Sequence, residues 1–177
     1  MSWDSCAANP LSADRRNPKL VGTIRLRIGD PSMGAIGHSM IPWPQRQADS
    51  PRRTCTPTAV WDGDGPIWCA EGPKVRIAGV AARELDGTCR VNHPCPTVSA
   101  IAARDALVKI LGGAHGSLPT GHVKVRSSPL TCLSSGSAGG SRTAAWCRSV
   151  AVGDLSCAVV QAGGAVRWPR YWRKHRC

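Results

Sequence analysis

Short stretches of alternating hydrophobic and polar residues recur from residue 54 onward, and turn residues separate them. Val75 and Ile77, for example, are β-branched residues on either side of Arg76, a pattern typical of a strand with one buried face. Turns are indicated at residues 62–66 (Asp-Gly-Asp-Gly-Pro) and at residues 71–73 (Glu-Gly-Pro). The pattern predicts five strands, at residues 54–61, 67–70, 75–80, 122–126 and 142–147, with a Ser/Gly-rich stretch at residues 134–141 before the last.

Pro57 interrupts the first predicted strand, so we expect an edge strand or a bulge there. Two other segments have hydrophobic residues at helical spacing. The first begins after a cap at Thr97 or Ser99, and Asp154 caps the second. The resulting order, β-β-β-α-β-β-α, predicts a mainly β (α+β) domain. It is compatible with a five-stranded, partly open barrel of the oligonucleotide-binding type (OB-fold) with two to three helices, although other small α+β folds share this order.

Residues 1–53 differ from the rest of the chain. They contain six prolines, scattered charges and no apolar stretch longer than a few residues, so we predict a poorly ordered N-terminal extension followed by one domain at residues 54–177. No run approaches the roughly 18 apolar residues of a membrane-spanning helix, and we expect no membrane span. The extension also lacks the basic, apolar and small-residue regions of a secretory signal.

Positive charge is concentrated in the predicted domain. The chain has a formal net charge of +12, and residues 51–177 hold 17 basic and 7 acidic side chains, a net charge of +10. Such a field attracts polyanions, which favours single-stranded DNA or RNA as a partner. The tail at residues 167–176 combines this charge with Trp168, Tyr171 and Trp172. These rings could stack on bases while Lys174 neutralises phosphate, or they could pack under the barrel and leave only the charges in solvent.

Cysteine is also concentrated in the predicted domain, which holds eight of the nine. An even, dispersed set predicts disulfides and an oxidising, extracytoplasmic compartment, periplasmic or secreted. Zinc is the alternative, because Cys89, His93 and Cys95 cluster and His175 lies two residues before Cys177. Since no secretory signal is evident, we hypothesise that the natural protein starts elsewhere; detection of Met1 on the native protein by mass spectrometry would contradict this.

Three fragments carry a resemblance to a known family. They are Asp62-Gly63-Asp64, the segment Val-Arg-Ile-Ala-Gly-Val-Ala-Ala-Arg-Glu at residues 75–84, and Ser141-Arg142-Thr143 before a strand. In this order and spacing they resemble the thermonuclease (staphylococcal-nuclease-like) family over about residues 54–177. The resemblance implies an oligonucleotide-binding barrel that hydrolyses DNA or RNA phosphodiesters with calcium.

The resemblance also implies roles for individual residues. Asp64 matches a metal-binding carboxylate, and Asp62 is its neighbour in the turn. Arg76 and Arg142 match two arginines that hold the scissile phosphate, and Glu84 matches the carboxylate proposed to activate the attacking water. These residue types suit the chemistry, because a phosphoryl transition state needs cations on its oxygens and an oriented water. The planar fork of arginine meets two phosphate oxygens at once.

Two departures from the family pattern bear on the metal. Ala81 stands where the family has Asp, and Arg83 stands where it has Pro. Calcium takes about 6–8 oxygen ligands, so with Asp64, the Ala82 carbonyl and a water-mediated Glu84 as the remaining candidates we expect a weakened calcium site. We hypothesise that Arg83 occupies part of the vacated position and forms a phosphate pocket with two other arginines, unless it simply points to solvent. The predicted phosphate-binding or nucleic-acid-binding residues are Arg76, Arg83, Arg142, Trp172 and Lys174.

Three functions remain open from the sequence. The first is a weak or altered thermonuclease-like phosphodiesterase, in which Arg76, Glu84 and Arg142 are the catalytic residues. The second is a catalytically inactive nucleic-acid-binding module, which the loss of a carboxylate at Ala81 favours. The third is a disulfide-stapled domain whose charge addresses an envelope surface. We expect a monomer in each case.

The predicted topology also suggests how the eight cysteines pair, although eight cysteines allow 105 pairings. One bridge would close the loop before the first helix, one would cross the last hairpin, one would tie the tail to the second helix, and one would join two adjacent strands. These pairs are Cys89–Cys95, Cys132–Cys147, Cys157–Cys177 and Cys55–Cys69.

Overall fold

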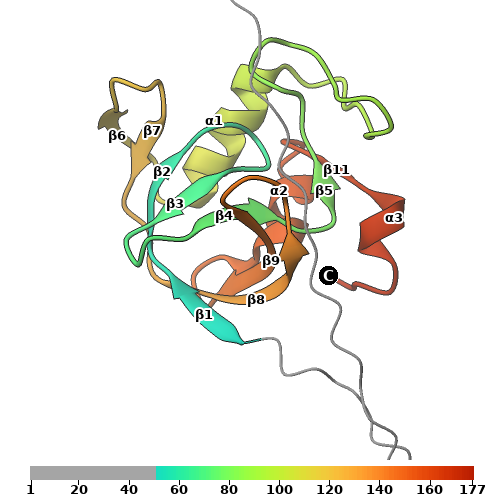
Figure 1. Cartoon of the computed structure of the whole chain (residues 1–177). Coiled ribbons are helices and arrows are strands. Elements are labelled where there is room, and N and C mark those ends of the chain that lie inside the picture. Colours follow the sequence, from blue (N-terminus) through green and yellow to red (C-terminus); the bar gives the residue numbers. More distant parts are fainter. Residues whose placement is uncertain (1–50) are drawn as a thin grey trace, which may run out of the picture. The chain divides into compact units, whose positions relative to one another are not determined.

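The computed structural model describes residues 51–177, so the predicted disorder of the N-terminal extension lies almost wholly outside the described residues. The described part is mainly β, with three short helices (Figure 1). The strands are β1 (Arg52–Cys55), β2 (Pro57–Val60), β3 (Ile67–Cys69), β4 (Lys74–Ile77), β5 (Val80–Ala81), β6 (Ala114–Ser117), β7 (Val123–Val125), β8 (Leu130–Ser137), β9 (Arg142–Ser149), β10 (Gly153–Asp154) and β11 (Val166–Arg167). The helices are α1 (Ala100–Ile110), α2 (Leu155–Gln161) and α3 (Pro169–Trp172).

The main sheet curls because β1 and β2, which follow one another directly in the chain, pair with strands at different places in the sheet order. The sheet order is β1-β8-β9-β4-β3-β2-β7-β6, and β1 and β2 are separated only by Thr56. The first predicted strand is therefore two strands, of which β1 pairs with β8 and β2 pairs with β3. The register shifts between Pro57 and Ala59, which confirms the predicted bulge. Proline lacks an N–H to donate to a ladder, and the bend redirects the chain from one neighbour to the other.

Two strands of the sheet differ from the sequence prediction. The Ser/Gly-rich stretch forms the end of β8, where Ser134 pairs with Ala145 and Ser137 pairs with Thr143 across a second register shift. Its side chains are mostly exposed, so backbone pairing rather than a hydrophobic pattern makes it a strand. The short strand β6, beside β7, was likewise not predicted, because all four of its residues are exposed.

Both predicted helices are confirmed, with their caps. The Ser99 hydroxyl accepts a hydrogen bond from the Ala102 N–H at 3.2 Å, so Ser99 rather than Thr97 is the N-cap of α1. Asp154 caps α2 in the same way, through the Cys157 N–H at 3.0 Å. Helix α1 stops before a glycine with φ of 95°, a conformation that other residues rarely adopt. The longest helix of residues 51–177 has 11 residues, too few to cross a bilayer.

The core is built from aliphatic side chains of the sheet and the first two helices. Ile67 and Ile77 from the sheet and Leu107 and Leu155 from the helices are almost wholly buried. Each such side chain contributes roughly 1.5–3 kcal/mol by leaving water. Helix α1 contacts β2 and α2, and α2 contacts β9, so the helices cover one side of the curled sheet. The sequence has no Phe, and the core cluster includes buried cysteines and Trp172 beside the aliphatic side chains.

Four disulfides join all eight cysteines of the described residues, and all four predicted pairings are confirmed. Two are buried, one closes an exposed loop on itself, and one joins the C-terminal tail to α2. The zinc alternative for Cys89 and Cys95 is not realised, because these two cysteines are bonded to each other. The bridges are Cys55–Cys69, Cys89–Cys95, Cys132–Cys147 and Cys157–Cys177.

Candidate functional site

The parallel pairing of β4 with β9 brings two of the predicted site arginines together. Lys74 pairs with Arg142, and Arg76 pairs with Ala144 two positions further on. Because side chains two residues apart project from the same face of a strand, Arg76 and Arg142 lie on one face of the sheet. The hydrogen-bonded pairing of β4 with β9, which are far apart in the sequence, thus positions both arginine side chains.

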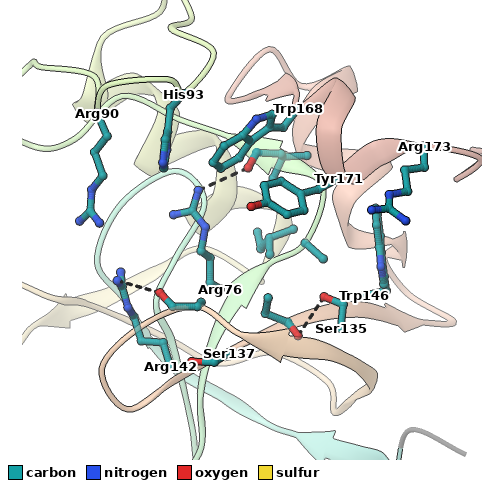
Figure 2. A pocket seen from close by; sticks show the side chains of 16 residues that line it. Arg76, Arg90, His93, Ser135, Ser137, Arg142, Trp146, Trp168, Tyr171 and Arg173 are labelled. Atoms are coloured by element: carbon teal, nitrogen blue, oxygen red, sulfur yellow. Dashed lines mark hydrogen bonds between the residues drawn. The ribbon is translucent and has the colours of Figure 1, made fainter. Parts of the chain in front are cut away.

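Both arginines line a cavity of about 600 Å³, which we call the arginine cavity (Figure 2). Arg90, from the loop before α1, extends its guanidinium toward theirs. No Asp or Glu of residues 51–177 lines this cavity, although Arg76 and Arg90 pair with Asp64 and Glu84 outside its lining. Its cationic side chains are Arg76, Arg90, Arg142 and Arg173, and its aromatic rings are His93, Trp146, Trp168 and Tyr171.

The aromatic side of the cavity comes from the loop before α1, from β9 and from the C-terminal tail. The ring centroids of His93 and Trp168 are 4.0 Å apart, and those of Trp168 and Tyr171 are 4.7 Å apart, edge to face. Tyr171 is 46% exposed, so its ring is accessible from solvent. Burial lowers the pKa of His93, and the charges of Arg76 and Arg90 lower it further.

Asp64 is occupied by Arg76 rather than open to a metal. The guanidinium donates to both carboxylate oxygens, at 3.0 and 2.7 Å, and the Ala82 N–H donates to Oδ2 at 2.9 Å. The pair is largely buried, with 5% of the Asp64 side chain and 13% of the Arg76 side chain exposed. Burial raises the pKa of Asp64, and the Arg76 charge and the Ala82 N–H oppose that shift.

Asp62 and Glu84 line a second, smaller cavity of about 330 Å³, which Arg90, His122 and Arg142 also line. The two cavities share Arg90 and Arg142. Burial, reinforced by the nearby Asp64 charge, raises the pKa of Asp62 to about 8. Glu84 accepts a hydrogen bond from Arg90 Nε at 2.6 Å.

These carboxyl groups do not fit a calcium ion in this arrangement. Calcium needs about 6–8 oxygens, several of them anionic. Asp64 is held by Arg76, Glu84 is held by Arg90, and Asp62 accepts the Asp64 N–H at 3.1 Å. Since Ala81 supplies no side-chain oxygen, each carboxyl of this group already has a partner that a metal would have to displace.

The structure does not bring Arg83 together with Arg76 and Arg142. Its guanidinium donates to the backbone carbonyls of Gly87 at 2.7 Å and Pro96 at 2.8 Å, so it braces the loop before α1 instead of lining either cavity. Arg90, on that same loop, takes the position beside the other two arginines.

The two tail residues predicted to bind nucleic acid lie away from the arginine cavity. Trp172 is 8% exposed and belongs to the core, where its ring packs edge-on against Trp146. Lys174 is exposed and does not line the cavity. The tail therefore divides: Trp168 and Tyr171 line the cavity, and Trp172 packs under the sheet. The basic and aromatic composition of the tail indicated both base stacking and core packing, but it did not indicate which ring has which role.

The sequence did not indicate Arg90 as a cavity residue, and it indicated His93 only as a zinc candidate beside Cys89 and Cys95. They lie in a loop of no regular structure, and only the cysteines on either side of them mark it. The Cys89–Cys95 bridge restrains this loop, which a search for cations near paired cysteines could have picked out.

Comparisons of this chain with family models, with curated proteins and with solved structures find no match. They neither support nor oppose the thermonuclease resemblance, and the site rests on its own geometry.

Proposed function

We propose that the protein binds single-stranded nucleic acid, with a backbone phosphate in the arginine cavity. The observation that supports this most strongly is the convergence of Arg76, Arg90 and Arg142 on one concave surface that no carboxylate of residues 51–177 lines. Phosphate oxygens are the ligands that such a cluster of guanidinium groups holds best.

The hydrogen bonds leave donors free for a phosphate. Arg142 is held by the carbonyls of Gly139 and Ala138 through Nε and Nη2, and within residues 51–177 its Nη1 has no partner. Arg90 uses only Nε, toward Glu84, so both of its terminal nitrogens remain available. The carbonyls and the carboxylate hold the two guanidinium groups in place, which lowers the entropy lost on binding.

The aromatic side supports a nucleic acid over a free phosphate. Trp168 and Tyr171 face the cavity, and a base next to the bound phosphate could stack on their rings. Stacking of this kind contributes about 1–3 kcal/mol per base and tolerates any sequence. Because bases of a duplex are already stacked on one another, this preference applies to single strands.

The proposal includes the finer description of the fold. We interpret the curled sheet as a five-stranded barrel of the oligonucleotide-binding type, in which β1 and β2 together form one strand and β3, β4, β9 and β8 form the others. The pairing of β1 with β8 and of β2 with β3 supports closure, as does the disulfide that joins Cys55 to Cys69. The four disulfides further support a periplasmic or secreted location.

Binding is tested with fluorescently labelled single-stranded DNA and RNA over a range of salt concentrations. We expect Arg142→Ala and Arg90→Ala each to weaken binding and to lower the slope of log K against log salt by about 1, the signature of one lost phosphate contact. Arg126→Ala is the matched control, because Arg126 is exposed and lines neither cavity. Equal losses in all three variants would reduce the effect to net charge, and absence of binding at low salt would refute the proposal.

Slow thermonuclease-like hydrolysis is the second candidate, because Asp62, Glu84 and Arg142 line one cavity. In this candidate Glu84 leaves Arg90 and orients a water, and Arg142 stabilises charge on the phosphate. We expect the unaltered protein to cleave single-stranded DNA weakly or not at all, with calcium or with a chelator, and Ala81→Asp to cleave only with calcium. Cleavage by the unaltered protein that Glu84→Gln abolishes would establish the enzyme; cleavage that survives Glu84→Gln would indicate a contaminant.

A further inference from the structure

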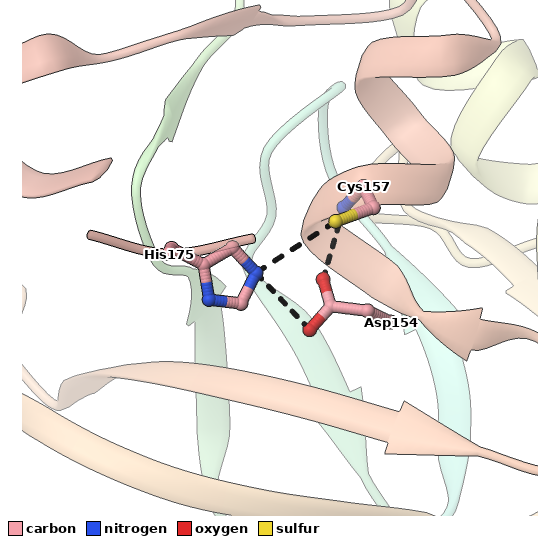
Figure 3. Close-up of side chains that lie close together, drawn as sticks. All are labelled: Asp154, Cys157 and His175. Atoms are coloured by element: carbon pink, nitrogen blue, oxygen red, sulfur yellow. Dashed lines mark hydrogen bonds and ion pairs between the residues drawn. The ribbon is translucent and has the colours of Figure 1, made fainter. Parts of the chain in front are cut away.

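A group of metal-binding side chains lies at the C-terminus, apart from both cavities. Asp154, Cys157 and His175 each bring one ligand atom within 4.8 Å of the others (Figure 3). His175 Nε2 is 3.2 Å from Asp154 Oδ2 and 3.7 Å from Cys157 Sγ. Cys157 is bonded to Cys177, the last residue of the chain. We call these four residues the C-terminal cluster.

Asp154 and His175 are held by contacts that do not depend on a metal. Asp154 Oδ1 caps α2 through the Cys157 N–H at 3.0 Å, which turns Oδ2 toward His175. The His175 ring stacks on Trp146 with centroids 3.9 Å apart and ring planes 22° apart. Its backbone N–H donates to the Trp172 carbonyl at 2.9 Å. Ligands oriented in this way by neighbouring groups are typical of protein metal sites.

We propose that the reduced form of the Cys157–Cys177 bridge is a zinc site. Its ligands are the thiolates of Cys157 and Cys177, His175 Nε2 and an Asp154 carboxylate oxygen, which is the four-ligand nitrogen, sulfur and oxygen set that zinc takes. The ligands come as two closely spaced pairs, Asp-x-x-Cys at the start of α2 and His-x-Cys at the chain end. The second pair is the spacing that the sequence singled out and that the proposed function does not use.

The chemistry balances with a dithiol as reductant. The dithiol gives two electrons and two protons to the disulfide, becomes a disulfide itself, and leaves Cys157 and Cys177 as thiols. Zinc then replaces one proton on each sulfur, because the thiolate is the ligand. In the oxidised form the two sulfurs are bonded to each other and supply no thiolate, so the disulfide and the metal exclude one another.

Charge and accessibility favour this bridge over the two buried ones. Zinc with two thiolates and one carboxylate carries one net negative charge, and Arg173, Lys174 and Arg176 supply compensating positive charge from the same tail. Cys177 is exposed, so a reductant reaches it, whereas the Cys55–Cys69 and Cys132–Cys147 bridges are buried. Zinc would keep the tail, and with it Trp168 and Tyr171, attached to α2 after reduction.

The test uses the full chain carrying Cys89→Ser and Cys95→Ser, which removes the other accessible bridge and leaves Cys157–Cys177 as the one a mild reductant attacks. A phosphine reductant avoids the zinc binding of dithiols. We expect one Co²⁺ per reduced chain with the charge-transfer absorption of two thiolates, displacement by Zn²⁺, and no binding before reduction. His175→Ala should weaken binding by more than about tenfold, since loss of an outer-shell partner alone costs that much.

His93→Ala is the matched control, because His93 is also a partly buried histidine that packs on a tryptophan. It should leave metal affinity unchanged. A reduced chain that keeps its near-ultraviolet circular dichroism and binds no metal would overturn the proposal, as would equal affinity in His175→Ala. If reduction alone unfolds the chain, zinc must restore the fold in the parent and not in His175→Ala; failure to restore it in the parent also overturns the proposal. The zinc site does not depend on nucleic-acid binding.

Discussion

At the scale of single residues, the site is defined by which partner each charged group finds. Arg76 neutralises Asp64, Arg90 holds Glu84, and Arg83 satisfies two backbone carbonyls. A buried charge without a partner costs several kcal/mol, so Asp64 and Glu84 each take an arginine, whereas Asp62 accepts the backbone N–H of Asp64. Ala81 supplies no side-chain oxygen here, and the neighbouring carboxylates of Asp64 and Glu84 each hold an arginine.

His93 gives the cavity a pH dependence. Burial and the charges of Arg76 and Arg90 lower the pKa of His93 in the free protein, and Glu84 opposes this weakly. A bound phosphate adds negative charge and raises that pKa, so binding takes up a proton. By linkage, affinity for an oligonucleotide should increase as pH falls from the pKa of the complex toward the lower pKa of the free protein.

This prediction is checked by binding titrations between pH 5 and 8 at constant ionic strength. His93→Gln keeps a polar side chain of similar size and should remove most of the dependence. His115→Gln is the control, because His115 is exposed and lines neither cavity. An affinity that increases with pH would contradict the assignment.

At the scale of elements, local signals determine where the helices begin. Thr97 and Ser99, which both precede α1, are residue types that commonly cap helices. Only Ser99 accepts a hydrogen bond from the Ala102 N–H. Ser99→Ala should therefore lower the free energy of unfolding by about 1 kcal/mol. Thr97→Ala should change it by less than about 0.5 kcal/mol, as exposed substitutions away from caps do. Urea denaturation of both variants measures the difference, and equal losses would show that Thr97 shares the cap.

The strands depend less on their own sequences. Strand β8 runs through serines and glycine that no propensity favours, because β9 beside it offers a full ladder of backbone partners. The interruption at Thr56 divides one stretch of chain into β1, which pairs with β8, and β2, which pairs with β3. The hydrophobic pattern alone predicts a single strand there.

At the scale of the whole molecule, the arginine cavity is assembled from segments far apart in the sequence. Strand β4 supplies Arg76, the loop before α1 supplies Arg90, β9 supplies Arg142, and the tail supplies Trp168. Bridges restrain two of these segments: Cys89–Cys95 restrains the loop before α1, and Cys157–Cys177 joins the tail to α2. The disulfides thus support the cavity as well as the stability of a core without Phe.

The sequence by itself determined the mainly β character, the two longer helices with their caps, the bulge at Pro57 and the cysteine pairs. These features depend on signals within a few residues, or on neighbours that a simple topology brings together. The tertiary structure alone decided that Arg83 braces a loop, that Arg90 joins the cavity, and that Trp172 is core while Trp168 is not. The direction of a long side chain depends on partners from other segments, and those partners become neighbours only when the chain has folded.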